Sequence, residues 1–341
     1  MRPHLFAVLV VALFAIPVLA QELEWIRQIG TVGSEQAIAA APDASGGLYV
    51  AGLTTGDLAA PNVGYHDAWL ARYDSAGTQI WIRQFGTGLS EDAAAAAPDM
   101  VGGVYVGGHT AGSLGGPLVG LFDAWVARYD DAGNQIWIRQ LGTAAIDTLR
   151  AAATDGSGGV YVFGDTQGTL GGSTAGNYDT WLARYDDAGN RLWIHQLGSS
   201  DEDHGKAAAS DGSGGVFIGG KTPGGLAGTN PTSPKSEAWL ARYDGAGNQL
   251  WIHQFGTDLD DEVWGLAPDG QGGVFLSGSS QGDLGGTNPN FGTYDAWVAR
   301  YDSAGNQTWI RQFGTGLDDL VRGRQPMVPA ASMSTEVLSV T

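Results

Sequence analysis

The sequence predicts an all-β fold made of tandem four-stranded sheets, and two observations carry that prediction. The tetrapeptide Trp-Ile-Arg/His-Gln recurs six times with spacings of 56, 56, 56, 58 and 58 residues, starting at Trp25, Trp81, Trp137, Trp193, Trp251 and Trp309. A period this regular indicates one supersecondary unit copied in tandem. Within each copy, short runs of β-branched and aromatic residues alternate with turns rich in Gly and Asp, which is the pattern of strands.

The copy at residues 87–142 shows the four predicted strands in chain order. They are expected at Ala93–Ala97, Val104–Gly108, Ala124–Tyr129 and Gln135–Gln140. Alanine is the best helix former, but a run of five that Pro98 closes is too short for an isolated helix. We therefore expect this alanine run to be the first strand of the unit.

The connections between these strands alternate in length. Residues 99–103 and 130–134 form short links whose Gly residues suit tight turns, whereas residues 110–123 and 142–147 form longer loops. Four antiparallel strands with alternating short and long links are typical of one β-propeller blade. The small alanine side chains of the first strand suit the crowded axis of such a ring.

The number of copies predicts five complete blades and an incomplete sixth. Within the propeller domain, expected at 21–324, complete units lie at 31–86, 87–142, 143–198, 199–256 and 257–314, and a partial unit lies at 315–324. The chain also begins with a lone fourth strand, Glu22–Ile29. We expect this strand to complete the sixth blade together with the defective C-terminal unit, because closure removes open sheet edges.

The sixth unit loses the repeat pattern in the tail at residues 325–341. Met327 stands thirteen residues after Gly314, where four preceding units carry an Asp. If the gene is read in the frame that begins at the third base of each codon here, the residues around Met327 permit the repeat string Asp-Gly-Ser-Gly-Gly-Val-Tyr-Val. Our hypothesis is that the tail is an out-of-frame reading of a normal sixth unit, and the alternative is a divergent natural tail.

Residues 1–20 are predicted to be a signal peptide. Arg2 precedes the apolar run Leu5–Leu19, and Val18-Leu19-Ala20 offers small residues for cleavage before Gln21. The alternative is an uncleaved N-terminal anchor. No later apolar segment approaches membrane-spanning length. The chain is therefore expected to be secreted or held at the bacterial cell surface, without membrane insertion after cleavage.

Charge and cysteine usage exclude several classes of function. The chain has no Cys, which excludes disulfides, thiolate metal sites and cysteine nucleophiles. Its net charge is −19, from 36 acidic and 17 basic side chains. Nucleic acids and anionic membranes attract basic surfaces, so neither is expected as a partner. The expected partner is an unidentified protein or glycan, and the chain is expected to be a monomer.

Eleven of the twelve tryptophans recur at two positions per unit and are predicted to be structural. Neighbouring blades bury both faces of a blade, so large aromatic side chains there fill the space between blades. These residues are Trp25, Trp69, Trp81, Trp125, Trp137, Trp181, Trp193, Trp239, Trp251, Trp297 and Trp309. Trp264 instead interrupts the alanine strand of the fifth unit, where it either narrows the axial channel or marks an asymmetric pocket.

Acidic residues recur on the face of the long loops. Candidate metal ligands at this repeated location are Asp92, Asp147, Asp203 and Asp261. A ring of carboxylates could bind Ca²⁺, which takes several oxygen ligands. The alternative is solvated loop acids, which the absence of a recognisable calcium loop favours. Apart from this Ca²⁺, no cofactor is expected.

The repeated string of the first unit resembles a known family. It resembles the SBBP repeat, a bacterial β-propeller repeat, at Asp67–Asp74 (DAWLARYD), Ala76-Gly77, Ile80-Trp81 and Phe85-Gly86, and then at Gly102–Val106 (GGVYV). The resemblance covers residues 22 to about 320 and implies exported or cell-surface proteins, mostly without a defined activity. It implies no catalytic residues. The present unit is longer than the usual one in its loops.

The predicted function is a non-enzymatic exported scaffold that presents its loop face to a protein or glycan at the cell surface. One alternative is a propeller enzyme, a lyase or glycosidase, with carboxylates at the channel mouth as acid and base. Another is a calcium-dependent adhesion module. Nearly identical repeats argue against an enzyme, because a catalytic site needs unique polar residues. The strongest departures from the repeat are Trp264, His204, Lys206 and Lys221.

Overall fold

The computed structural model describes residues 25–227, 235–286 and 292–320, and every regular element in them is a β-strand. The first blade comprises β1 (Glu35–Pro42), β2 (Leu48–Thr54), β3 (Asp67–Tyr73) and β4 (Gln79–Phe85). The second comprises β5 (Ala95–Pro98), β6 (Val104–Thr110), β7 (Asp123–Tyr129) and β8 (Gln135–Leu141). The third comprises β9 (Asp147–Thr154), β10 (Val160–Thr166), β11 (Asp179–Tyr185) and β12 (Arg191–Leu197). The fourth comprises β13 (His204–Ser210), β14 (Val216–Thr222), β15 (Glu237–Tyr243) and β16 (Gln249–Phe255). The fifth comprises β17 (Asp261–Pro268), β18 (Val274–Ser280), β19 (Asp295–Tyr301) and β20 (Gln307–Phe313).

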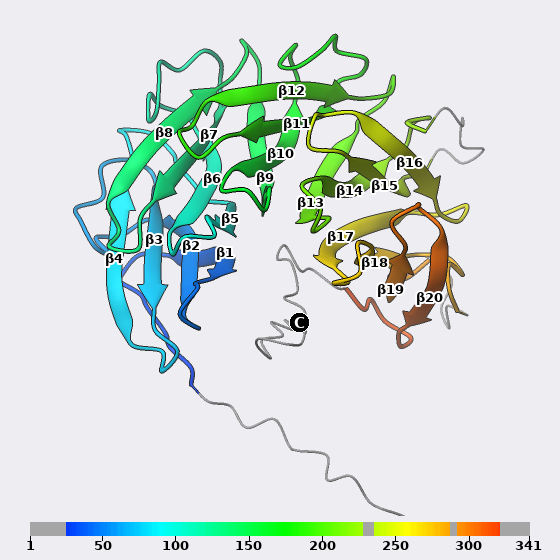
Figure 1. Cartoon of the computed structure of the whole chain (residues 1–341), viewed down its shortest axis with the longest axis horizontal. Helices are drawn as coiled ribbons and strands as arrows, with labels where there is room; N and C mark the ends of the chain where they lie inside the picture. Colours follow the sequence, from blue (N-terminus) through cyan, green and yellow to red (C-terminus); the bar gives the residue numbers. More distant parts are fainter. Residues whose placement is uncertain (1–24, 228–234, 287–291, 321–341) are drawn as a thin grey trace, which may run out of the picture.

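Each blade is an antiparallel meander whose strands pair in chain order. The first strands β1, β5, β9, β13 and β17 surround a common centre, and the fourth strands form the rim (Figure 1). The described residues therefore form five blades of a β-propeller, as the repeats predict. The described part of the chain contains no helix that is apolar and long enough to cross a membrane.

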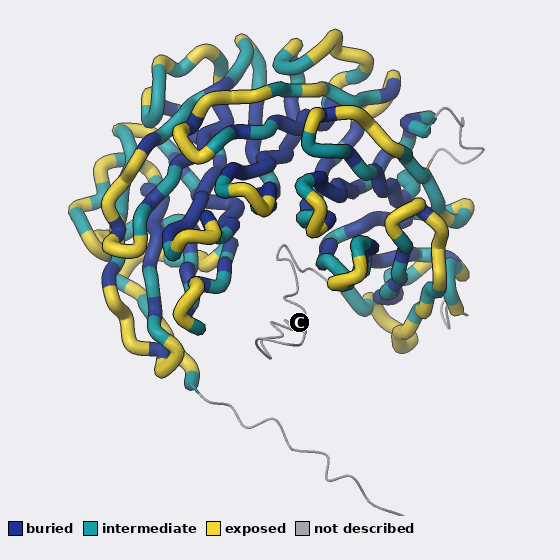
Figure 2. The backbone as a smooth tube through the Cα atoms, in the orientation of Figure 1, coloured by how far each residue is buried: buried dark blue, intermediate teal, exposed yellow. Residues whose placement is uncertain are grey.

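The hydrophobic core is divided into layers between adjacent blades. Trp125 of the second blade packs with Tyr49 and Leu70 of the first blade in one such layer. The third-strand tryptophans of all five blades have at most 1% of their surface exposed. Buried residues fill the interior of the ring, while exposed residues follow the rim and the turns (Figure 2). Alternate side chains of each strand therefore point to opposite faces of the blade, and each set is buried against one neighbouring blade.

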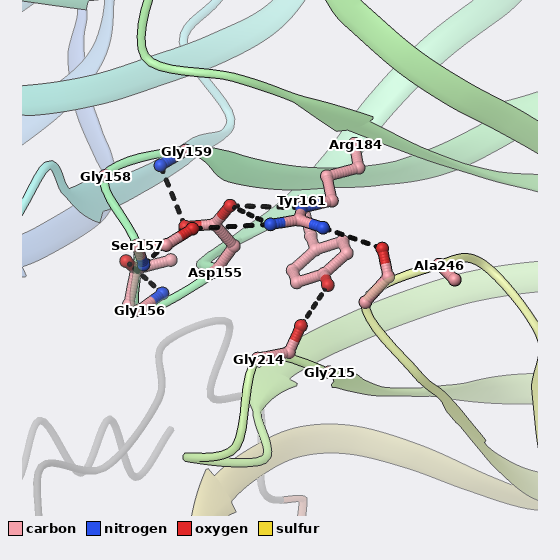
Figure 3. A network of polar contacts seen from close by, with 12 residues as sticks. Asp155, Gly156, Ser157, Gly158, Gly159, Tyr161, Arg184, Gly214, Gly215 and Ala246 are labelled. Carbon is pink, nitrogen blue, oxygen red and sulfur yellow. Dashed lines mark hydrogen bonds and ion pairs between the residues drawn. The ribbon is translucent and has the colours of Figure 1, made fainter.

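Polar contacts repeat at the same boundaries, on the side of the short turns. Arg184 forms an ion pair with Asp155 of its own blade at 2.7 Å and donates a hydrogen bond of 2.7 Å to Gly245 O of the next blade. Tyr161 donates to Gly214 O, also in the next blade, at 2.5 Å (Figure 3). The ion pair recurs in the other blades as Arg72–Asp43, Arg128–Asp99, Arg242–Asp211 and Arg300–Asp269.

The first described residues lie against the first blade in the position of a preceding blade's fourth strand. Trp25 Nε1 donates to Ser75 O at 3.1 Å, and Arg27 Nε donates to Gly77 O at 2.8 Å. Trp81 and Arg83 make the matching contacts with the second blade, again fifty residues further along the chain. Residues 25–30 form no strand of their own, so the predicted pairing with a sixth sheet is not seen within the described residues.

The last described residues repeat the start of a blade. Thr315 N donates to Asp319 Oδ2 at 2.5 Å, as Thr257 N does to Asp261 Oδ2 in the fifth blade. The expected partial unit at 315–324 therefore begins in register. The tail at 325–341 and the predicted signal peptide lie outside the described residues.

Candidate functional site

The innermost strands carry a β-bulge at the same repeat position in four blades. The pairing register shifts there in β1, β9, β13 and β17, so one residue of each of these strands has no pairing partner in the second strand of its blade. These bulged residues are Ile38, Arg150, Lys206 and Trp264, and the equivalent residue of the second blade is Ala94. Bulges re-aim side chains and are frequent beside functional sites. The residue type at this position also varies more between blades than at most positions of the repeat. This variation indicates that packing between blades does not determine the residue there.

A second variable pair of residues lies next to the bulge. Residues two positions earlier on the first strand pair with the second strand as Gln36–Leu53, Thr148–Asp165, His204–Lys221 and Glu262–Ser279. In the second blade Asp92 and His109 occupy these positions, with Asp92 Oδ1 2.9 Å from His109 Nδ1. The third and fourth blades place charged side chains at both the bulge and this pair, and the fifth blade places Trp264 at the bulge and Glu262 in the pair.

Asp165 connects the third and fourth blades. Its Oδ2 accepts a hydrogen bond from Arg150 Nε at 3.2 Å, and its Oδ1 accepts one from Gly205 N of the next blade at 2.7 Å. His204 Nδ1 lies 3.5 Å from Asp165 Oδ2. The side chain of Asp165 is 2% exposed. One buried carboxylate thus fixes the position of a guanidinium and a neighbouring backbone.

Lys206 reaches from the fourth blade to the fifth. Its ammonium nitrogen lies 4.8 Å from the centroid of the Trp264 ring, which is a cation–π contact. Burial lowers the pKa of Lys206 below its usual range, and the Asp165 carboxylate partly offsets this. Among the described residues, no carboxylate lies within ion-pair distance of this ammonium.

A third cation completes the group. Lys221 Nζ lies 3.4 Å from Glu262 Oε2 across the same blade boundary. The indole N–H of Trp264 donates to Ser279 Oγ at 2.9 Å, which orients the ring. We call the seven side chains of this region the axial cluster: Arg150, Asp165, His204, Lys206, Lys221, Glu262 and Trp264. All of them lie on the two innermost strands of the third, fourth and fifth blades.

The axial cluster brings together all four residues that the sequence singles out as departures from the repeat. Sequence reasoning did not single out Arg150, Asp165 or Glu262. Aligning the five copies on the Gly that closes each unit could have found them, because the variable positions then stand out against nearly constant ones.

The predicted metal ligands are not brought together. Asp147, Asp203 and Asp261 are buried and cap a loop, each by accepting a backbone N–H from the residue four positions earlier. Glu91 holds the equivalent position in the second blade, so Asp92 is one residue out of register with the other three. The described residues contain no group of three or more His, Asp or Glu side chains arranged to hold a metal ion. A Ca²⁺ site therefore stays a prediction.

Arg83 on the rim is exposed and also contacts the next blade. Arg83 lies over the Trp81 ring at 5.4 Å and donates to Gly133 O of the next blade at 3.1 Å. His195 packs instead on Trp193, with ring centroids 5.1 Å apart. This position therefore contributes to contacts between blades, and it keeps only part of its surface in solvent.

Comparison with known proteins assigns no family to the chain. No family model matches the chain. An alignment of 234 residues, which covers 62% of the chain, shows 28% identity to the regulatory protein FlaEY of Caulobacter vibrioides. The chain spans 23% of the length of that relative.

Solved structures match the chain at low sequence identity. One is a protein of unknown function from Bacteroides caccae, with a TM-score of 0.46, 10% identity, and coverage of 84% of this chain and 85% of that one. Another is the WD40 domain of Neurospora crassa Pan2, with a TM-score of 0.44, 13% identity, and coverage of 80% and 63%. The five described antiparallel sheets, which are arranged around a common centre, define the class of the fold as a β-propeller.

Proposed function

We propose that this protein is an exported, non-enzymatic β-propeller that binds a protein or glycan ligand at the axial cluster. The observation that carries the proposal is the location of the asymmetry. Five nearly identical blades differ most at the bulge and its neighbouring pair, and the charged and aromatic differences meet on three adjacent blades. Residues that only stack blades have no reason to differ in this way.

Export and family membership belong to the same proposal. The N-terminal sequence has the composition of a signal peptide, and the repeat resembles the SBBP repeat. The similarity to a segment of a protein named as a regulator is compatible with a role in binding a partner. A rigid ring that carries few polar side chains near its axis suits such a role, because fixed scaffolds position binding groups.

The chemistry of Lys206 favours one second candidate. An amine whose pKa is lowered by burial is unprotonated more often near neutral pH than an ordinary lysine, so it is available as a general base of the kind that polysaccharide lyases need. Incubation of the protein with polysaccharides, followed by detection of reducing ends and unsaturated products, separates the two candidates. Binding without product formation supports the scaffold, and product formation that Lys206→Met abolishes supports the enzyme.

A binding screen of the mature chain tests the proposal. The protein is applied to arrays of glycans and exported proteins, with and without Ca²⁺. The matched variant replaces Arg150, Lys206 and Trp264 by Ala, the residue that the second blade carries at this position. We expect the parent chain to bind a defined ligand set and the folded variant to lose it, with a lower melting temperature because the buried Asp165 loses its contact with Arg150. Equal binding by both proteins would contradict the proposed site, and binding only in Ca²⁺ would favour adhesion.

A further inference from the structure

We infer that the axial cluster binds a hexuronic acid residue, a pyranose ring that bears a carboxylate. This inference rests on the proposed function and names the ligand class of the same site. Three features of the cluster support it: an ammonium with no carboxylate within ion-pair distance among the described residues, an aromatic ring beside it, and one more cation than carboxylates among its seven side chains.

The charges of the cluster do not cancel. Asp165 is engaged by Arg150 at 3.2 Å and by Gly205 N at 2.7 Å, and Glu262 is engaged by Lys221 at 3.4 Å. These contacts satisfy two of the three cations. The third, Lys206, has no carboxylate within 4.0 Å among the described residues, so the cluster leaves one positive charge that a ligand carboxylate can neutralise.

The site should favour a ligand that carries a single carboxylate on each sugar ring. The cluster has one cation more than it has carboxylates, so it can neutralise one carboxylate of a ligand. A carboxylate that reaches the cluster gains charge-assisted hydrogen bonds from Lys206 in a partly buried site, where they are stronger than in water.

Trp264 supplies the contact for the sugar ring. Aromatic side chains offer a large apolar face, and this one is held by its N–H bond to Ser279 and by the Lys206 ammonium. The cation–π contact also holds the Lys206 ammonium beside the ring. A hexuronate whose C–H face lies against the free part of the indole would therefore bring its carboxylate close to the ammonium. A neutral hexose would keep the stacking contact and lose the charged one.

Calorimetric titration of the mature chain with glucuronate and galacturonate tests this inference, with glucose and galactose as matched neutral sugars. We expect the acids to bind at least about tenfold more tightly than the neutral sugars, as the loss of one charge-assisted hydrogen bond predicts. Oligogalacturonate against the monosaccharide shows whether the ligand is a free acid or part of a polymer. Tighter binding of the oligomer indicates a polymer.

Three variants isolate the groups responsible. Lys206→Met should weaken acid binding about tenfold and leave neutral sugars unaffected, whereas Trp264→Ala should weaken both. Ile38→Ala, at the equivalent bulge of the first blade, serves as the control and should change neither. Each variant's melting curve must match that of the parent chain. Where a variant does not fold, competition for parent-chain binding by the methyl ester of galacturonate, which lacks the charge, gives the same comparison.

Two outcomes overturn the inference and are distinct from failure of the proposed function. Equal affinity for acid and neutral sugars, or acid binding that Lys206→Met leaves unchanged, contradicts the ligand class. If the arrays then show a neutral glycan or a protein bound through the cluster, the proposed function stands and the hexuronate is wrong. If the symmetrised variant binds everything that the parent chain binds, the proposed function itself is wrong.

Discussion

At the scale of single residues, the blades contain two kinds of buried aspartate with opposite electrostatics. Asp155 lies in a short turn, where burial raises its pKa. The Arg184 guanidinium and the N–H groups of Ser157 and Gly159 lower this pKa by more than burial raises it, so the net shift is downward. Asp261 lies at the start of a first strand, where burial raises its pKa and the N–H and hydroxyl of Thr257 only partly compensate. The first carboxylate is stabilised as an anion, and the second is not.

This contrast predicts opposite responses to substitution by Asn. The pKa of Asp155 is below its unfolded value, so its contribution to stability is present above about pH 4 and is lost as the pH falls through the folded pKa. Asp155→Asn should lower the free energy of unfolding at pH 7 by about 3 kcal/mol, because it leaves Arg184 without its partner. Urea unfolding between pH 3 and pH 7 should show a weaker pH dependence for the variant than for the parent chain.

Asp261→Asn is the matched substitution. The folded pKa of Asp261 is above its unfolded value, so its contribution is present below about pH 4 and is lost as the pH rises through the folded pKa. Its replacement by Asn should leave the free energy of unfolding at pH 7 unchanged or slightly higher. A loss as large as that of Asp155→Asn would show that the two carboxylates do not differ as described.

At the scale of elements, the hairpin between the third and fourth strands is a contact point between blades. Gly133 has a φ of +78°, and the Trp81 ring of the preceding blade covers it. A Cβ atom there would lie 2.8 Å from the ring. Gly156, in a short turn, has a similar φ of +74°, but a Cβ atom would meet nothing within 4 Å. Both glycines therefore adopt a left-handed backbone conformation that favours glycine, but only Gly133 also has a neighbouring side chain that leaves no room for a Cβ atom.

Substitution of each glycine by Ala separates these requirements. Gly156→Ala should cost about 1 kcal/mol of unfolding free energy, from the left-handed backbone alone. Gly133→Ala should cost about 1–3 kcal/mol more, because the Trp81 ring must move. Denaturant unfolding of both variants measures the difference. Equal losses would mean that the tryptophan does not constrain the hairpin.

The predicted elements show where sequence patterns are sufficient and where they fail. The strands expected at Val104–Gly108 and Gln135–Gln140 occur as β6 (Val104–Thr110) and β8 (Gln135–Leu141), because alternation and turn residues mark them locally. The alanine run Ala93–Ala97 appears as β5 (Ala95–Pro98). The run itself gives no sign of the bulge position, because a bulge depends on how two strands pair.

The candidate site was harder to predict for a related reason. Lys206 and Trp264 stand out in the repeat, but they are 58 residues apart, and only the radial stacking of two blades brings them within 4.8 Å. Arg150 and Asp165 look like ordinary charged residues in the sequence. Their importance follows from the pairing of β9 with β10 and from the hydrogen bond to Gly205.

At the scale of the whole molecule, the five described blades form an open arc (Figure 1). The two terminal blades expose apolar residues that are buried elsewhere in the repeat. Phe275 and Val298 of the fifth blade are only partly buried, whereas their counterparts in the other blades are almost fully buried, and Phe313 is 53% exposed. Leu48 and Val50 of the first blade show the same difference. The arc therefore presents two faces that match a missing blade.

A chain with a restored sixth blade should be more stable. In this variant a copy of residues 257–306 replaces residues 315–341, so that residues 25–30 can serve as the fourth strand. Burial of the two terminal faces should raise the melting temperature by at least about 5 °C and reduce binding of the dye ANS. An unchanged melting temperature and unchanged dye binding would show that the terminal faces do not require another blade.

We infer that eleven tryptophans hold the blades together and that Trp264 belongs to a ligand site. The most direct test is an NMR titration of the twelve indole N–H signals with galacturonate, in which Trp264→Phe identifies one signal. We predict that the Trp264 signal alone shifts progressively with ligand. Shifts of several structural tryptophans, or saturating ligand without any shift of Trp264, would contradict the claim.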